Sequence, residues 1–124
     1  IQPSFAVTDA AELGPALGPE RAARAYPWAQ LAQAGVAMLA GTDYPIEVLE
    51  PLPSLARLAR GESRRPGFVT TSSAPAQARL PAHIAFALMT DPAAGQTLLS
   101  ADPRAVPADA IDDIEVLGTR PAPF

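Results

Sequence analysis

The stretch that decides the fold reads A-G-V-A-M-L-A-G-T-D-Y-P-I-E and covers residues 34–47. Within it, residues 36–40 form a short apolar run bounded by Gly35 and Gly41. Such a run is typical of a strand that is buried on both faces, as in a parallel sheet covered by helices. The run ends in polar residues at Thr42 and Asp43, and Pro45 stops any continuation. The pattern predicts a buried strand with a carboxylate at its C-terminal end.

Asp43 is the first candidate for a functional residue, because α/β barrels and doubly wound sheets keep their chemistry at the C-terminal ends of their strands. Two interpretations are open. In one, Asp43 is an Asx-type turn residue that hydrogen-bonds its own backbone before Pro45. In the other it is a metal ligand or a general base, since a carboxylate binds divalent cations and can carry a proton from bound water. Tyr44 follows it and is a candidate for lining a substrate pocket.

The composition excludes several classes of protein. The 124 residues are 48% hydrophobic, enough for one modest core. Nine basic residues, all arginine, stand against 13 acidic ones, and no basic stripe indicates nucleic-acid binding. Without cysteine the chain has no disulfide and no thiolate metal site. No apolar stretch approaches the roughly 20 residues of a membrane span. No signal peptide is visible, so we expect a cytoplasmic protein.

The order of expected elements predicts an α/β fold followed by a small β appendage. We expect strands over residues 1–7, 36–40, 96–100 and 114–119, helices over 19–34, 54–60 and 81–90, a helical turn over 107–110, and loops over 8–18 and 61–78. Pro27 is expected to kink the first helix and Gly35 to end it. In the second helix, Leu55 and Leu58 are expected to face inward, with Arg57 and Arg60 outward. The chain opens on Ile1 inside an expected strand, which indicates a piece of something longer.

Other titratable residues are weaker candidates. Glu47 and Glu50 lie near enough to Asp43 to join a site, although loop carboxylates are usually only solvated. His83 is the only histidine and belongs to the helix expected after Pro81, where packing or exposure is more common than ligation. A Ser-His-Asp triad would have to use His83 without a supporting G-x-S-x-G motif. There is no P-loop and no G-x-G-x-x-G motif.

Four segments together resemble a known family. They are Q-P-S-F (2–5), L-G-P-E-R-A-A-R-A-Y-P-W (17–28), A-G-V-A-M-L-A-G-T-D-Y-P-I-E (34–47) and S-A-D-P-R-A-V-P-A-D-A-I-D-D-I-E-V-L-G-T (100–119). In this order they resemble the C-terminal part of the amidohydrolase-3 type, a branch of the metal-dependent amidohydrolase superfamily. Only residues 61–78 have no clear counterpart.

The resemblance implies the last two βα units of a (β/α)₈ TIM-like barrel over residues 1–94, including the long loop 61–78. Residues 95–124 would then be the C-terminal strands of a small composite β-sandwich. Residues 2–5 would close barrel strand seven, and residues 36–42 would be strand eight. Asp43 matches the strand-eight aspartate that, in the family, binds the metal and takes a proton from the attacking water. The resemblance thus implies a divalent metal, most readily zinc, and a small-molecule amide-type substrate.

The family's histidines of earlier strands have no counterpart here. One aspartate cannot hold a catalytic zinc, which needs three protein ligands, and two strands cannot close a barrel. The first hypothesis is therefore a portion of a metal-dependent hydrolase of C–N bonds, inactive without an upstream barrel segment. In it a metal-bound hydroxide would attack the carbonyl, while Asp43 passes the proton to the leaving nitrogen. The second hypothesis is a non-catalytic α/β interaction module or degenerate barrel remnant, which would associate with itself or a partner through unpaired strands.

Overall fold

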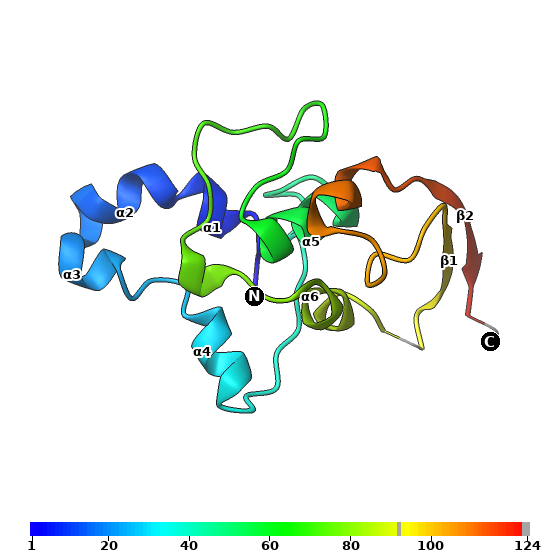
Figure 1. The fold of residues 1–124 in the computed structure, drawn as a ribbon, viewed down its shortest axis with the longest axis horizontal. Helices are drawn as coiled ribbons and strands as arrows, with labels where there is room; N and C mark the ends of the chain where they lie inside the picture. Colours follow the sequence, from blue (N-terminus) through cyan, green and yellow to red (C-terminus); the bar gives the residue numbers. More distant parts are fainter. Residues whose placement is uncertain (92, 123–124) are drawn as a thin grey trace.

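The computed structural model describes residues 1–91 and 93–122 and shows a mixed helical and β-strand chain with a small two-stranded sheet. The helices are α1 (Phe5–Thr8), α2 (Ala10–Leu17), α3 (Pro19–Ala22), α4 (Trp28–Gln33), α5 (Pro51–Arg60) and α6 (Ala82–Leu88), the 3₁₀ helices are η1 (Ala76–Ala78) and η2 (Ala108–Asp113), and the strands are β1 (Gly95–Leu99) and β2 (Val116–Pro121). Figure 1 shows α2 and α3 at one end of the molecule and the β1–β2 hairpin at the other, with α5 between them.

Helix α5 is the central element, and its two ends follow from the sequence. Pro51 occupies the first helical position, where its missing N–H costs no hydrogen bond. Gly61 ends the helix in the left-handed conformation with φ 92°, and its N–H donates to the carbonyl of Arg57 at 2.7 Å. This positive φ favours glycine, and a Cβ here would lie 2.5 Å from Nε of Arg79, so any other residue would also displace the Arg79 side chain. The helix predicted over residues 54–60 is confirmed.

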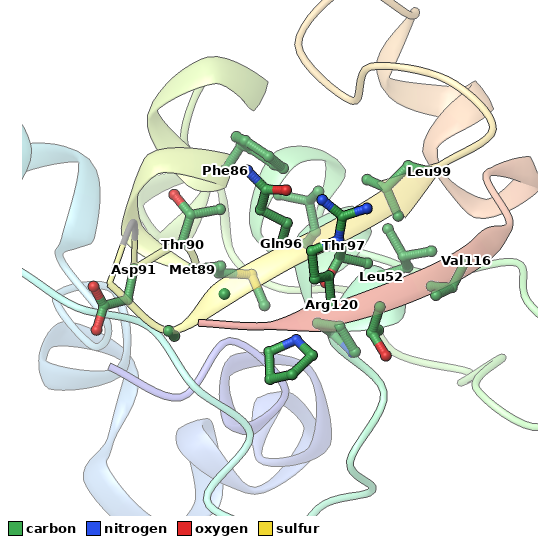
Figure 2. A pocket seen from close by; sticks show the side chains of 16 residues that line it. Leu52, Phe86, Met89, Thr90, Asp91, Gln96, Thr97, Leu99, Val116 and Arg120 are labelled. Carbon is green, nitrogen blue, oxygen red and sulfur yellow. The ribbon is translucent and has the colours of Figure 1, made fainter. Parts of the chain in front are cut away.

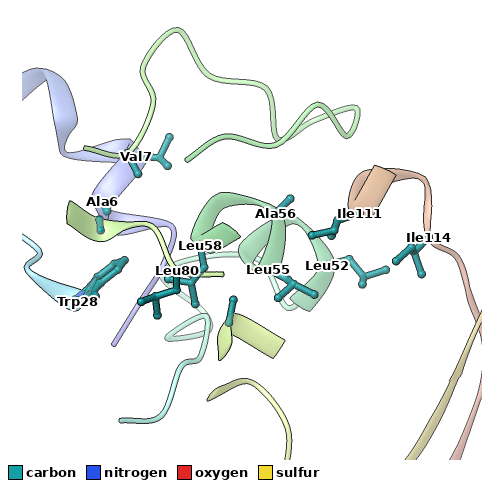
Figure 3. Packing of buried hydrophobic residues seen from close by; sticks show 13 residues of the cluster. Ala6, Val7, Trp28, Leu52, Leu55, Ala56, Leu58, Leu80, Ile111 and Ile114 are labelled. Carbon is teal, nitrogen blue, oxygen red and sulfur yellow. The ribbon is translucent and has the colours of Figure 1, made fainter. Parts of the chain in front are cut away.

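The hydrophobic core surrounds α5 (Figure 3). Helix α6 and η2 both contact α5, and the N–H of Leu80 donates to the carbonyl of Leu58 at 2.8 Å. Each leucine side chain that is fully buried stabilises the fold by about 1.5–3 kcal/mol. The buried hydrophobic residues are Ala6, Val7, Trp28, Leu52, Leu55, Ala56, Leu58, Ala74, Ala78, Leu80, Ala85, Ile111 and Ile114.

Strands β1 and β2 form an antiparallel hairpin with Thr97 opposite Thr119. The register is irregular between Leu98 and Leu99, since Leu98 pairs with Gly118 and Leu99 with Val116. The strands predicted over residues 96–100 and 114–119 are confirmed, as is a helical turn after Pro107. Leu98, Val116 and Leu117 remain exposed, so this sheet has uncovered apolar surface.

The N-terminal predictions were wrong. Residues 1–7 do not form a strand, since α1 begins at Phe5, and α2 occupies most of the stretch expected to be a loop. Alanine, leucine and glutamate are good helix formers and dominate residues 10–17. They outweigh Pro15, which lies within α2. Gly18, with φ 76°, then separates α2 from α3.

The helix expected over residues 19–34 is divided into α3 and α4. It begins at Pro19 as predicted, but Tyr26 adopts φ 53° and Pro27 follows, so the expected kink is a complete break. Gly35 has φ 73° and its N–H donates to the carbonyl of Ala32, which confirms that it ends this helical region. In the part of the chain that is described, no helix is long and apolar enough to cross a membrane.

The predicted buried strand over residues 36–40 is also absent from the structure. Val36 is 47% exposed and Leu39 is 77% exposed. The stretch still makes backbone hydrogen bonds on either side. The ammonium of Ile1 donates to the carbonyl of Leu39 at 2.6 Å, and the N–H of Gly41 donates to the carbonyl of Ile1 at 3.0 Å. On its other side, the N–H of Ala40 donates to the carbonyl of Leu88 at 2.8 Å. The stretch is extended but has too few paired neighbours to form a ladder.

Candidate functional site

Asp43 lies in an exposed turn at the end of the extended stretch. It has φ 57°, a left-handed conformation that aspartate tolerates better than most residues. Its carbonyl accepts a hydrogen bond from the N–H of Ile46 at 2.9 Å, which closes the turn. Among the described residues, the Asp43 carboxylate has no hydrogen-bond or ion-pair partner. The backbone of Asp43 therefore forms the turn. Its side chain makes no Asx-type hydrogen bond to that turn within the described residues. Tyr44 beside it is exposed.

Glu47, four residues beyond Asp43, is held by a buried arginine. Its carboxylate oxygen Oε2 lies 3.8 Å from Nη1 of Arg57, and only 18% of the Glu47 side chain is exposed. The same Nη1 donates to Oγ of Ser4 at 2.7 Å, and Nη2 donates to the carbonyl of Phe68 at 3.0 Å. Arg57 therefore joins three segments that are far apart in the sequence.

Arg57 was predicted to face outward from α5, and this prediction was wrong. The residue is only 4% exposed, and its guanidinium lies 5.9 Å from the ring centre of Phe68. Burial lowers the pKa of the Arg57 guanidinium, while the charges of Glu47 and Asp112 act in the opposite direction. Among the described residues, Nε of Arg57 has no hydrogen-bond partner. The two acidic neighbours offset part of the cost of burying this charge.

A second polar cluster fastens the long loop to the C-terminal part of the chain. The carboxylate of Asp112 accepts hydrogen bonds from Nη2 of Arg60 at 2.6 Å, from Oγ of Ser63 at 2.6 Å and from the N–H of Arg64 at 2.7 Å. Burial raises the pKa of Asp112, but the three hydrogen bonds and the charge of Arg60 outweigh it, and the net pKa is lowered. This cluster is structural, since its acceptor atoms are fully used by the protein.

The other acidic residues and the histidine do not gather around Asp43. Glu50 lies 3.6 Å from Nε of Arg65 and is about half exposed, and His83 lies on the exposed face of α6. Within residues 1–91 and 93–122, no three His, Asp or Glu side chains are placed to hold a metal ion. The donor set of the described chain therefore does not fit a zinc centre by itself, which needs at least three protein ligands.

A cleft of about 630 Å³ lies between α5, α6 and the hairpin (Figure 2). Its floor is apolar and includes Leu52, Phe86 and Leu99, while Asp91 and Arg120 belong to its lining. Its volume is in the range of small-molecule sites. Neither Asp43 nor Tyr44 lines this cleft, so the structure does not bring the predicted site residues to it.

Sequence reasoning missed both Arg57 and the cleft. Arg57 stands between Ala56 and Leu58 in a pattern that places it on the polar side of a short helix. Its partners Ser4 and Phe68 lie 53 and 11 residues away, so no local signal indicates them. The cleft depends on how the hairpin lies against α5 and α6, which is also a long-range property.

The comparison with protein families gives the class of the chain. The mixed helical and strand structure does not define an activity by itself. The exposed carboxylate of Asp43 does not define one either. The model of the amidohydrolase family matches residues 1–106, which is most of the chain. The chain therefore belongs to the amidohydrolase family, and the resemblance to the amidohydrolase-3 type is confirmed. No curated protein and no solved structure matches it.

Proposed function

We propose that this chain is a portion of a metal-dependent hydrolase that cleaves amide-type C–N bonds of a small molecule, and that Asp43 is its catalytic and metal-ligating carboxylate. The observation that carries the proposal is the state of Asp43 in a chain of the amidohydrolase family. Its carboxylate is exposed and has no partner among the described residues, although the backbone of the turn is held in place. A carboxylate kept in this way is available to a ligand. Tyr44, exposed beside it, is proposed to contact the substrate.

The hydrogen bonds of Ile1 support the proposal that residues 36–42, which are not a strand in this structure, form a barrel strand when the remaining barrel strands lie beside them. Ile1 donates to the carbonyl of Leu39 and accepts from the N–H of Gly41. In a parallel pair of strands, a residue bonds in this way to the two residues that flank its partner, which here is Ala40. In this proposal residues 1–94 belong to the barrel and residues 95–124 to a small β-sandwich, and Asp43 lies at the carboxyl end of a strand, where barrel enzymes keep their chemistry.

The exposed apolar side chains between residues 36 and 49 support the need for a further barrel segment. Six large side chains in this stretch are exposed: Val36, Leu39, Tyr44, Ile46, Val48 and Leu49. Exposed large apolar side chains in such number are typical of a surface that meets a partner. We propose that the remaining barrel strands cover the aliphatic ones, leave Tyr44 to the substrate, and supply the metal ligands that the described residues lack. Zinc is the metal that best suits such a mixed nitrogen and oxygen ligand set.

The role proposed for Asp43 itself is proton transfer. A carboxylate can take up a proton released during hydrolysis and deliver it to the leaving nitrogen, which departs as an amine. The exposed position of Asp43 leaves both carboxylate oxygens accessible for this task.

The test is metal-dependent amide hydrolysis by the full-length polypeptide that contains these residues. The probes are N-acetylglycine, N-acetylleucine and 4-nitroacetanilide, assayed before and after removal of metal with a chelator. We expect at least one amide to be hydrolysed, the activity to disappear with the metal, and zinc to restore it. Hydrolysis that is unaffected by removal of all bound metal would contradict the proposal.

The second candidate is a non-catalytic interaction module that associates through uncovered strands. The observation that favours it is the hairpin, whose two strands are the whole of its sheet among the described residues and whose Leu98, Val116 and Leu117 are exposed. An H-x-H pair in sequence preceding Ile1 would favour the enzyme, and its absence there would favour the module.

A further inference from the structure

We propose that Arg57 is a positioning residue that sets the place of the Asp43 turn by holding Ser4 and Glu47 at the same time. This inference rests on the proposed function, because it assigns a role toward the carboxylate of Asp43. Ser4 follows Ile1 in the chain, and Glu47 follows the extended stretch to which Ile1 is hydrogen-bonded. Arg57 therefore connects the two segments a few residues beyond the point where they pair.

The first step is that Arg57 is itself fixed. It belongs to α5, the most deeply buried helix of the chain, and its neighbours Ala56 and Leu58 are fully buried. Its guanidinium donates to Oγ of Ser4 and to the carbonyl of Phe68 at 2.7 and 3.0 Å. Two such bonds from a planar group determine both its position and its orientation.

The second step is that the position of Glu47 limits the position of Asp43. Only three residues separate them, and the hydrogen bond from the N–H of Ile46 to the carbonyl of Asp43 closes the turn between them. On the other side, Gly41 is bonded to Ile1. The turn is thus held at two points, at Gly41 by backbone pairing and at Glu47 by Arg57. Loss of the second point leaves the segment between Gly41 and the start of α5 at Pro51 without its central attachment.

The third step is the energetic cost of the arrangement. A buried guanidinium and carboxylate lose hydration, and a well-packed apolar pair of similar volume is often at least as stable. Nε of Arg57 has no hydrogen-bond partner among the described residues, which adds to this cost. The hydrogen bonds to Ser4 and Phe68 fix the direction of the guanidinium, and Glu47, at 3.8 Å, is attracted to that fixed position by charge. Such placement matters for a catalytic carboxylate, where an error of about 1 Å can lower the rate about 100-fold.

The test compares Glu47→Gln with Glu62→Gln in the full-length polypeptide, using the amide that the assays above show to be hydrolysed. Glu62 is a matched control, because it also pairs with arginine, at 3.7 Å from Arg60 and from Arg64, but 46% of its side chain is exposed. We expect Glu47→Gln to lower kcat about 10–100-fold, as for residues that support ligands, with KM and the unfolding temperature little changed. Glu62→Gln should keep the wild-type kcat.

A second measurement does not depend on activity. Hydrogen exchange of the peptide spanning residues 42–48 should become faster in Glu47→Gln and remain unchanged in Glu62→Gln, because the amide of Ile46 reports on closure of the turn. Ser4→Ala should act in the same direction as Glu47→Gln. Because both act through one guanidinium, the double variant should lose less than the product of the two single effects.

The outcomes separate this inference from the proposed function. If Asp43→Asn is inactive while Glu47→Gln and Ser4→Ala keep full kcat and wild-type exchange, Arg57 is only a packing residue and the inference is overturned. If Asp43→Asn itself keeps near-full turnover, the proposed function fails, and the inference fails with it. If the fractional loss of kcat in Glu47→Gln equals the fraction of the variant that is unfolded, the loss is due to instability, and the inference is also overturned.

Discussion

Two apolar regions of this chain have opposite environments. Helix α5 buries leucines at 52, 55 and 58 and even the charged Arg57, and the long loop, α6 and η2 are all attached to it. The stretch from residue 36 to residue 49 contains more large apolar side chains than α5, but most of them are exposed. Helix α5 lies in a packed core. Residues 36–49 have the apolar composition of a core element, but no segment of the described chain covers most of their side chains.

On the proposed function, this difference separates the residues that stabilise the chain from the residue that carries the chemistry. The stabilising residues lie on α5 and its partners, where Arg57 and Arg60 make hydrogen bonds through their terminal nitrogens. Asp43, whose carboxylate has no partner among the described residues, lies in the exposed stretch over residues 36–49. Arg57 is the side chain that connects the two, since it belongs to the core by position and to the Asp43 turn through Glu47.

The largest expected effect tests the contrast directly. Leu58→Ala should lower the free energy of unfolding of the 124-residue chain by about 2–5 kcal/mol, because it leaves a cavity at a fully buried position. Leu39→Ala makes the same chemical change at an exposed position and should change it by less than about 0.5 kcal/mol. Chemical denaturation of both variants measures the two values. Equal losses would show that residue 39 is packed as tightly as residue 58.

A somewhat smaller effect is expected from the cluster that joins the loop to η2. Asp112→Asn removes the charge that accepts hydrogen bonds from Arg60 and Ser63, and should destabilise the chain by about 3 kcal/mol. Asp113→Asn is the control, because Asp113 is exposed and has no hydrogen-bond partner among the described residues. Its stability should stay near the wild-type value.

The contribution of Asp112 should also depend on pH. Its pKa in the folded chain is below the ordinary value of 3.8, so the folded state binds the proton less readily than the unfolded state. The stabilisation is therefore complete above that value and is lost as the pH falls below it. Thermal unfolding between pH 7 and pH 2 should show the gap between wild type and Asp112→Asn closing in acid. A gap that stays constant would contradict this account.

The smallest effect is expected at Tyr26, which lies between α3 and α4. Its hydroxyl donates to a carboxylate oxygen of Asp9, and burial together with this bond raises the pKa of Tyr26 to about 12. Because the unfolded side chain ionises near 10, this stabilisation is present below pH 10 and is lost as the pH rises toward 12. Tyr26→Phe should cost about 1 kcal/mol at neutral pH. Absorbance at alkaline pH should show one tyrosine that ionises late in wild type and is missing in the variant.

The sequence predicted the elements whose signals are local. The helix predicted over residues 54–60 forms, although α5 begins three residues earlier, at Pro51. The alternating pattern of residues 114–119 marks the second strand, and Pro19 and Gly35 mark helix boundaries. It failed where the outcome depends on distant partners. Residues 36–40 have the composition of a buried strand, but a buried strand needs neighbours on both sides. Within the described chain, Ile1 and Leu88 are the distant residues that bond to this stretch, and Val36 bonds locally to the carbonyl of Leu31.

The candidate site shows the same division. The role of Asp43 was predicted from its place after an apolar run and from the family resemblance, and it stays a prediction. Arg57 could not be identified, because its burial depends on Ser4 and Phe68, which α5 meets only after folding. A periodic pattern predicts which face of a helix is polar, but it cannot predict that a polar side chain is enclosed by other segments.

The central claim is that Asp43 supplies the catalytic carboxylate, and the most direct measurement is kcat for amide hydrolysis by Asp43→Asn in the full-length polypeptide. Asp113→Asn serves as the matched control, since it is the same change at another exposed aspartate. The account predicts a loss of at least about 100-fold for Asp43→Asn, the size typical for removal of a general base, with wild-type turnover for the control. Near-full turnover by Asp43→Asn would contradict it.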